Sequence, residues 1–298
     1  MPLAGGLPVG SVVDRPCRWR RVGMMIHEIP DMQPILRINT SASAISLAIA
    51  SVSGYENMGN RRLRHLKLPP GTMLSEHYRV LERLGAGWEG EVYLIREITT
   101  GIERTAKLFL PHRNLHNRTL RFYARKLHKL RQCPFIIQYH SHSTFFWQDT
   151  PIAFLVSEFI EGELLSAYVK RQPGKRLPPF QAVHLLHTLA AGIECIHSMG
   201  EYHGDLHGDN VIVQRSGLGY ELKLIDLYHW GSPSPANIRN DVIMLIQLFH
   251  EILGGQRYYA KQPAAIKAIC CGLKHTLISK KFRTAGQLKA YLETMEWD

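Results

Sequence analysis

The pattern of apolar and polar residues divides the chain into a strand-rich half and a helical half. Short alternating or continuous apolar runs, typical of strands, follow one another between residues 78 and 156. From Phe180 onward the apolar positions recur at helical spacing. The predicted strands are Tyr78–Leu81, Glu91–Ile95, Glu103–Phe109 and Ala153–Val156, and the predicted helices are Leu120–Leu130, Phe180–Met199, Asp241–Leu253, Ala264–Leu273 and Ala285–Met295. This order predicts a two-lobed α+β architecture.

The first part of the chain lacks sustained periodicity and carries clusters of basic residues. We expect residues 1–70 to be a poorly ordered basic extension, either a solvated tail or a segment that touches an anionic partner. The folded part is then expected to span 71–298, with a β-rich N-lobe over 71–160 and a helical C-lobe over 161–298.

The charge of the chain favours an anionic ligand. Its 36 Lys and Arg against 25 Asp and Glu give a formal net charge of +11 and a pI near 9.5. This balance suits a nucleotide, a nucleic acid or a membrane surface. The basic residues are spread along the sequence without a recognition motif for nucleic acid, so we expect no nucleic-acid partner.

Cysteine usage and hydropathy predict a cytoplasmic location. The five cysteines include no C-x-x-C pair, which argues against a zinc site or a disulfide framework and for a reducing compartment. No apolar run reaches the length of a membrane span, since the best candidate, Ala44–Val52, is short and interrupted by serines.

The stretch His203–Asn210, HGDLHGDN, carries the most specific chemistry. The carboxylate of Asp205 precedes the amide of Asn210, and a second carboxylate, Asp226, ends a strand-like run. Alone, the octamer would also fit a solvated turn. Together these residues resemble the catalytic core of the protein-kinase-like superfamily. The resemblance implies that Asp205 is the base for an acceptor hydroxyl and that Asn210 and Asp226 hold Mg²⁺.

Further motifs occur in the order that the resemblance requires. Gly85, Gly87 and Gly90 form a G-x-G-x-x-G pattern, which in dinucleotide-binding folds leads into a helix but here leads into a strand. The family likeness implies a hairpin whose amides cover the phosphates of ATP, with Val92 against the adenine. It likewise implies that Lys107, inside the next strand, reaches the α- and β-phosphates.

The resemblance also assigns the adenine pocket and a structural anchor. Backbone groups near Glu158 and Ile160 would bond the adenine edge, and Ile212 would form the floor of the pocket. Asp241, on a later helix, would accept backbone amides of the loop near His203.

The helix after the lysine strand departs from the family pattern, because it lacks the glutamate that usually pairs with the lysine. No acidic residue lies between Glu103 and Asp149, and Tyr123 or Ala124 takes the glutamate's place. We therefore expect the strand lysine to pair with Asp226, with a phosphate or with the Tyr123 hydroxyl.

The catalytic loop is atypical too. Gly204 replaces the arginine of His-Arg-Asp, His207 replaces a lysine that contacts the transferred phosphate, and the stretch from Asp226 to Asp241 is too short for a long activation segment. This HGD loop is similar to those of small-molecule kinases such as the aminoglycoside phosphotransferases. The N-terminal half resembles a bacterial-type serine/threonine protein kinase.

The leading hypothesis is an ATP- and Mg²⁺-dependent phosphotransferase, most simply a serine/threonine protein kinase, acting on a hydroxyl of an unknown protein or small molecule. One alternative is a nucleotide-binding pseudokinase or scaffold, which the missing helix glutamate favours. Another is a metal hydrolase built on His203, Asp205 and His207, which would explain neither the strand lysine nor the glycine-rich hairpin.

Overall fold

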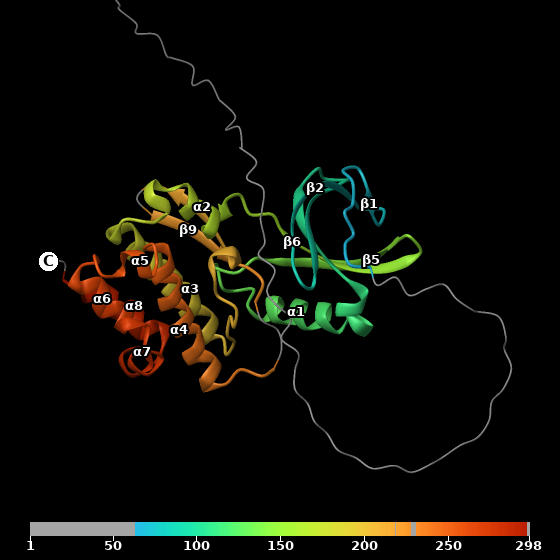
Figure 1. Ribbon diagram of the computed structural model, residues 1–298. Coiled ribbons are helices and arrows are strands. Elements are labelled where there is room, and N and C mark those ends of the chain that lie inside the picture. The colour runs from blue at the N-terminus through green and yellow to red at the C-terminus, as the bar shows by residue number, and fades with distance from the viewer. Residues whose placement is uncertain (1–62, 218, 228–230, 297–298) are drawn as a thin grey trace, which may run out of the picture.

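The computed structural model describes residues 63–217, 219–227 and 231–296, which form two lobes side by side (Figure 1). A six-stranded sheet forms most of the first lobe, and helices form most of the second. The predicted bilobal α+β architecture is therefore confirmed. Most of the expected N-terminal extension, residues 1–62, lies outside the described residues.

The N-lobe sheet is antiparallel throughout, in the order β1-β2-β3-β4-β6-β5. Its strands are β1 Met73–Leu74, β2 Tyr78–Ala86, β3 Gly90–Glu97, β4 Glu103–Phe109, β5 Tyr139–Trp147 and β6 Thr150–Glu158. Two short 3₁₀ turns, η1 Pro111–Arg113 and η2 Leu115–Asn117, lead from β4 into helix α1 Arg118–Lys129. This helix runs along one face of the sheet (Figure 1).

Alternation along β4 gives its two faces different partners. Ala106 and Leu108 are buried in the N-lobe core, whereas Phe109 belongs to the same apolar cluster as the buried residues of α1. Successive side chains of a strand point to opposite faces. Lys107 therefore shares the α1 side of the sheet with Phe109.

Residues 63–68, here called the N-terminal strap, close the other face. Leu66 and Leu68 are buried there. The carboxylate of Glu91, only 1% exposed, accepts the amides of Leu66 and Lys67 at 3.1 Å each. Tyr93 donates its hydroxyl to Glu91 and accepts the Leu68 amide at 2.9 Å. Packing of this lobe thus includes residues ahead of position 71.

The C-lobe surrounds the long helix α3, whose buried Leu185, Leu189 and Ile193 recur at helical spacing. Its helices are α2 Leu165–Arg171, α3 Pro179–Ser198, α4 Pro235–Ile252, α5 Gln256–Tyr259, α6 Ala264–Cys270, α7 His275–Lys281 and α8 Ala285–Thr294, with 3₁₀ turns η3 Pro173–Lys175, η4 Gly208–Asn210 and η5 Cys271–Leu273. A small sheet pairs β7 Glu163–Leu164, β8 Val211–Ser216 and β9 Gly219–Leu224.

Several element boundaries differ from those expected. Strand β5 was missed because small polar residues, including Ser141 and Ser143, weaken its apolar alternation. The helix predicted over 264–273 ends at Cys270, since Cys271 and Gly272 adopt positive φ angles of 50° and 59°, and α7 follows as a separate helix.

No helix in the described ranges is long and apolar enough to cross a membrane. The stretch Ala44–Val52 lies outside those ranges.

Replacing Glu91 by alanine should destabilise the N-lobe by about 2–4 kcal/mol, because it leaves buried amides and a hydroxyl without an acceptor. Thermal unfolding measures this change, with Glu82→Ala on the exposed side of β2 as the matched control. Equal melting temperatures for the two variants would contradict the role given to Glu91.

Candidate active site

The stretch His203–Asn210 forms a compact turn that places Asp205 beside Asn210. The Asn210 amide nitrogen donates to the Asp205 carbonyl at 2.8 Å and to its carboxylate oxygen Oδ2 at 3.1 Å. Asn210 is buried at the end of η4, whereas Asp205 is exposed. The amide of Ile225 donates to the Asn210 carbonyl at 3.0 Å, which joins this turn to the chain just before Asp226.

Helix α4 holds this turn in place through Asp241. The fully buried Asp241 carboxylate accepts the amides of His203 and Gly204, both at 2.8 Å, and the Nε2 atom of His197 lies 2.9 Å from it. The anchoring role predicted for Asp241 is confirmed.

Lys107 reaches from β4 to the C-lobe. Its ammonium lies 2.8 Å from Asp226 Oδ1, 2.8 Å from Glu89 Oε2 and 4.7 Å from the centre of the Tyr123 ring. Burial alone would lower the pKa of Lys107, but Asp226 and Glu89 raise it overall, so the side chain stays charged. For Asp226 the two effects have the opposite sign. Burial would raise the pKa of its carboxyl group, but the Lys107 ammonium lowers it overall.

Tyr123 occupies the place of the missing helix glutamate. Its hydroxyl accepts the Asp226 amide at 3.1 Å and donates to Asp226 Oδ1 at 3.4 Å. Of the expected partners of Lys107, Asp226 bonds it directly, and Tyr123 contributes its ring. Glu89 was missed, although an acidic residue inside a glycine-rich turn was a signal in the sequence.

Asn210 and Asp226 present the oxygen donors that Mg²⁺ prefers. The side-chain nitrogen of Asn210 donates to Asp205, so the side-chain oxygen of Asn210 takes no part in these two bonds. Asp226 has a φ of 53°, a left-handed conformation that costs a non-glycine residue energy and is common at functional sites. One carboxylate plus one amide is a small donor set, which fits Mg²⁺ because this ion usually takes its remaining ligands from phosphates and water.

The glycine-rich residues form a tight hairpin between β2 and β3. Gly85 pairs with Val92 in the ladder, and Val92 pairs with Lys107. A Cβ at Gly90 would lie 1.8 Å from the Leu108 carbonyl oxygen, so only glycine fits there. Gly87, at the turn, has open space around it. Val92 therefore lies beside Lys107 in the sheet, next to the glycine-rich hairpin.

The predicted adenine-pocket residues lie where the two lobes join. The Glu158 amide donates to the Gln138 carbonyl at 3.0 Å, and its carboxylate binds Gln138 N and Lys223 Nζ, both at 2.9 Å. Ile212 lies on β8 opposite Lys223 and Leu164. Ile160 follows β6 in the connection between the lobes.

His207 lies beside the candidate base, with Nε2 3.7 Å from Asp205 Oδ2. The His207 ring lowers the pKa of Asp205, and Asp205 raises the pKa of His207. Within the described ranges no group of three His, Cys, Asp or Glu side chains is arranged to hold a metal ion, and the His203 ring is buried. The metal-hydrolase alternative therefore gains no support.

Helix α1 is tied to the chain just before the His203–Asn210 turn. Glu201 lies 2.8 Å from Lys129 Nζ and 3.7 Å from Lys126 Nζ, and Lys129 also donates to the Gly200 carbonyl at 2.9 Å. Burial lowers the pKa of Lys126 to about 8. The basic helix thus contributes a fixed contact between the lobes.

Helix α4 begins soon after Asp226. Ser234 caps it by accepting the Asn237 amide at 3.3 Å, and Pro235 occupies the first turn. The expected shortening of the activation segment agrees with this early start. Tyr228 lies outside the described residues.

The match to known proteins agrees with this geometry. Residues 78–260 match the protein kinase domain, and the chain therefore belongs to the protein kinase family.

Relatives and solved structures give the same fold. The serine/threonine-protein kinase pkn2 of Myxococcus xanthus is 34% identical over 163 residues, which cover 53% of this chain and 18% of pkn2. A serine/threonine-protein kinase of Arabidopsis thaliana is 29% identical over 202 residues, or 66% of this chain and 37% of the relative. The PknI kinase domain of Mycobacterium tuberculosis superposes with a TM-score of 0.57 at 17% identity, covering 76% of this chain and 98% of that domain. The chain thus spans less than half the length of these curated relatives.

The buried His203 predicts a loss of stability in mild acid. Burial, with Lys126 nearby, lowers its pKa to about 4 against the opposing effect of Asp241 and Asp205, from an ordinary value of 6.5. Between these two pH values the unfolded chain binds a proton that the folded chain refuses, so the free energy of unfolding falls as the pH falls, by up to roughly 3 kcal/mol.

His203→Gln should flatten this part of the stability curve, whereas Gln at the exposed His184 should leave it unchanged. Chemical denaturation at pH 4 to 7 measures the effect, and equal slopes for wild type and His203→Gln would contradict it.

Proposed function

We propose that the chain is an ATP- and Mg²⁺-dependent phosphotransferase that passes the γ-phosphate to a hydroxyl, as a serine/threonine protein kinase does. The observation that carries the proposal is a chain of contacts: Lys107 bonds Asp226, the amide of the preceding residue bonds Asn210, and Asn210 bonds Asp205. Phosphoryl transfer depends mainly on positioning and on charge neutralisation, and these residue types supply both.

Each residue then has a distinct task. Asp205, ionised and exposed, orients the acceptor hydroxyl and takes its proton. Lys107 binds the α- and β-phosphates, and Asn210 and Asp226 hold the Mg²⁺ that neutralises the triphosphate. His207, 3.7 Å from the Asp205 carboxylate, would place a second titratable group near the transferred phosphate.

The nucleotide's base would lie between the lobes. The carbonyl of Glu158 and the backbone of Ile160 would bond the adenine edge, with Val92 above the ring and Ile212 below it. Gly85, Gly87 and Gly90 would keep side chains away from the phosphates.

A nucleotide-binding module without transfer is the second candidate, because Tyr123 replaces the helix carboxylate. The early start of α4 concerns the substrate that accepts the phosphate. It leaves a short segment after Asp226 for binding a peptide, which favours a small hydroxyl compound among the possible substrates. Turnover of radiolabelled ATP with the protein alone, with candidate proteins and with small alcohols separates these cases.

Asp205→Asn should lower the rate of transfer by roughly 100-fold or more while the affinity for ATP changes little, because the base acts on the acceptor. Asp226→Ala should instead weaken Mg²⁺–ATP binding. Asp209→Asn is the matched control, since Asp209 is exposed in the same turn and bonds Ser166. Intact turnover in Asp205→Asn would show that the base is misassigned.

Activity should not require phosphorylation of the short segment. Ser234 already serves as a helix cap. A phosphate on Ser232 would find no arginine in the catalytic loop to bind it, because that position is Gly204. Phosphatase treatment, Ser232→Ala and Ser234→Asn, which keeps a capping side chain, should leave the rate within about twofold of wild type. A large loss after any of the three would overturn this expectation.

A further inference from the structure

Glu89 at the tip of the glycine-rich hairpin makes a contact that the proposed function leaves unexplained. Its Oε2 atom lies 2.8 Å from the ammonium of Lys107. Both side chains are largely buried, with 13% of Lys107 and 19% of Glu89 exposed. A buried carboxylate at this distance is a strong partner for an ammonium, and its removal leaves a buried charge partly uncompensated.

We propose that Glu89 is the positioning residue of Lys107, a task that the hairpin performs here in place of helix α1. The ammonium is held between Glu89 and Asp226, and its remaining hydrogen is directed at the α- and β-phosphates. This proposal rests on the proposed function and names a residue that serves it through Lys107.

Helix α1 cannot supply the carboxylate. It contains no Asp or Glu, and its inward residue Tyr123 bonds Asp226 rather than the ammonium. The Tyr123 ring does lie 4.7 Å from Lys107 Nζ, which adds a weaker electrostatic contact.

Asp226 cannot serve Lys107 alone either. Its side chain is 40% exposed, more than that of Glu89, and it is the carboxylate that would bind Mg²⁺. A metal ion is the largest local charge in such a site, so a carboxylate that binds it holds an ammonium less firmly. Glu89 remains with Lys107 when the metal draws on Asp226.

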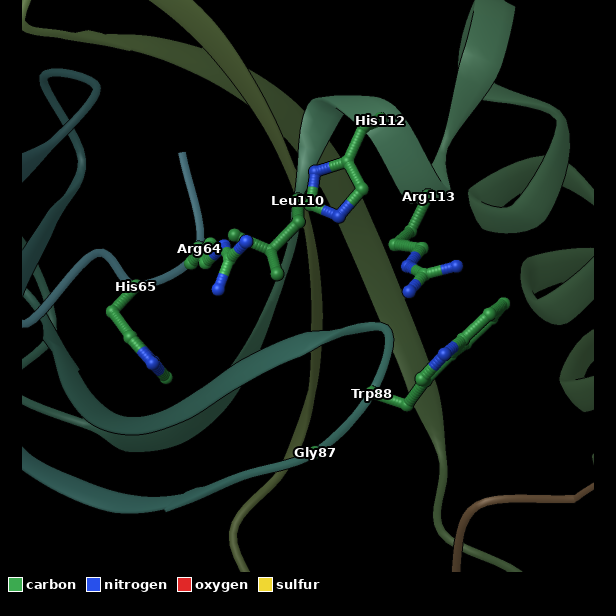
Figure 2. A pocket seen from close by; sticks show the side chains of 7 residues that line it. All are labelled: Arg64, His65, Gly87, Trp88, Leu110, His112 and Arg113. Atoms are coloured by element: carbon green, nitrogen blue, oxygen red, sulfur yellow. The ribbon is translucent and has the colours of Figure 1, made fainter. Parts of the chain in front are cut away.

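The hairpin is fixed firmly enough to aim Glu89. The Glu89 carbonyl accepts the Leu110 amide at 2.9 Å, and the Gly87 amide donates to the Gly90 carbonyl at 2.8 Å. On the outer side, the Arg113 guanidinium lies over the Trp88 ring, 3.8 Å from its centre (Figure 2). Trp88 thus turns outward onto η1 while Glu89 turns inward.

The contact between Trp88 and Arg113 lines a pocket of about 700 Å³ beside the hairpin, bordered by residues of the strap, the hairpin tip and η1 (Figure 2). Because Glu89 belongs to the hairpin, the distance between its carboxylate and Lys107 depends on the position of the hairpin and not on the position of α1.

The test starts with a double-mutant cycle that needs neither nucleotide nor activity. Thermal unfolding is measured for wild type, Glu89→Gln, Lys107→Met and the double variant. The change in melting temperature of the double variant, relative to wild type, should differ by several degrees from the sum of the changes in the two single variants. Additive shifts would mean that the pair does not form in solution, and the proposal would fall.

The second part measures the binding of an Mg²⁺-loaded non-hydrolysable ATP analogue and the steady-state rate. Glu89→Gln should weaken binding of the analogue and lower kcat/KM for ATP, each about tenfold, and Glu89→Asp, which keeps the charge, should recover part of the loss. Glu82→Gln, on the exposed side of β2, should match wild type.

Unchanged or tighter binding by Glu89→Gln would overturn the proposal, since tighter binding would mean that the carboxylate blocks the phosphates. A different outcome bears on the function. If wild type binds the analogue and Glu89→Gln binds it more weakly, but no variant turns over ATP with any acceptor, then Glu89 keeps its positioning role and phosphotransfer is refuted.

Discussion

The ion pair between Lys107 and Asp226 is the constraint on which the arrangement of the two lobes depends. Lys107 lies on a central strand of the N-lobe sheet, and Asp226 follows the last strand of the C-lobe sheet. A mostly buried ammonium costs several kcal/mol unless an opposite charge meets it. Glu89 of the same lobe meets part of this charge, and the 2.8 Å contact with Asp226 adds a partner from the C-lobe, so this ion pair holds the two lobes together.

Other contacts between the lobes add to this ion pair. Tyr123 bonds both the amide and the carboxylate of Asp226, and Glu201 binds the basic side of α1. Within the C-lobe, the Asp241 carboxylate accepts the amides of His203 and Gly204 and so holds the His203–Asn210 turn. In a kinase that is switched by phosphorylation, a new arginine–phosphate pair orders a loop. Here the contacts of Asp226 with Lys107 and Tyr123, and those of Asp241 with His203 and Gly204, hold the two sides of the site. The connection from Asp226 to α4 is short.

The fold could be predicted from the sequence because it follows from local patterns. The change from strand to helical periodicity predicts the two lobes, and the spacing of His203–Asn210, Asp226 and Lys107 predicts which charges converge. The strap and β5 were missed because neither has a strong apolar period. Glu89 was missed for another reason. Its place inside a glycine-rich turn is visible in the sequence, but its contact with Lys107 of β4 forms only in the folded hairpin and does not follow from spacing.

The most direct test of this account is isothermal titration calorimetry of the whole chain with ATP, with and without Mg²⁺. The account predicts one nucleotide per chain, bound more tightly with Mg²⁺ than without it, because Asp226 and Asn210 bind the ion and Lys107 binds the phosphates. Absence of binding under both conditions, or equal affinity with and without Mg²⁺, would contradict the central claim that these residues form a nucleotide site.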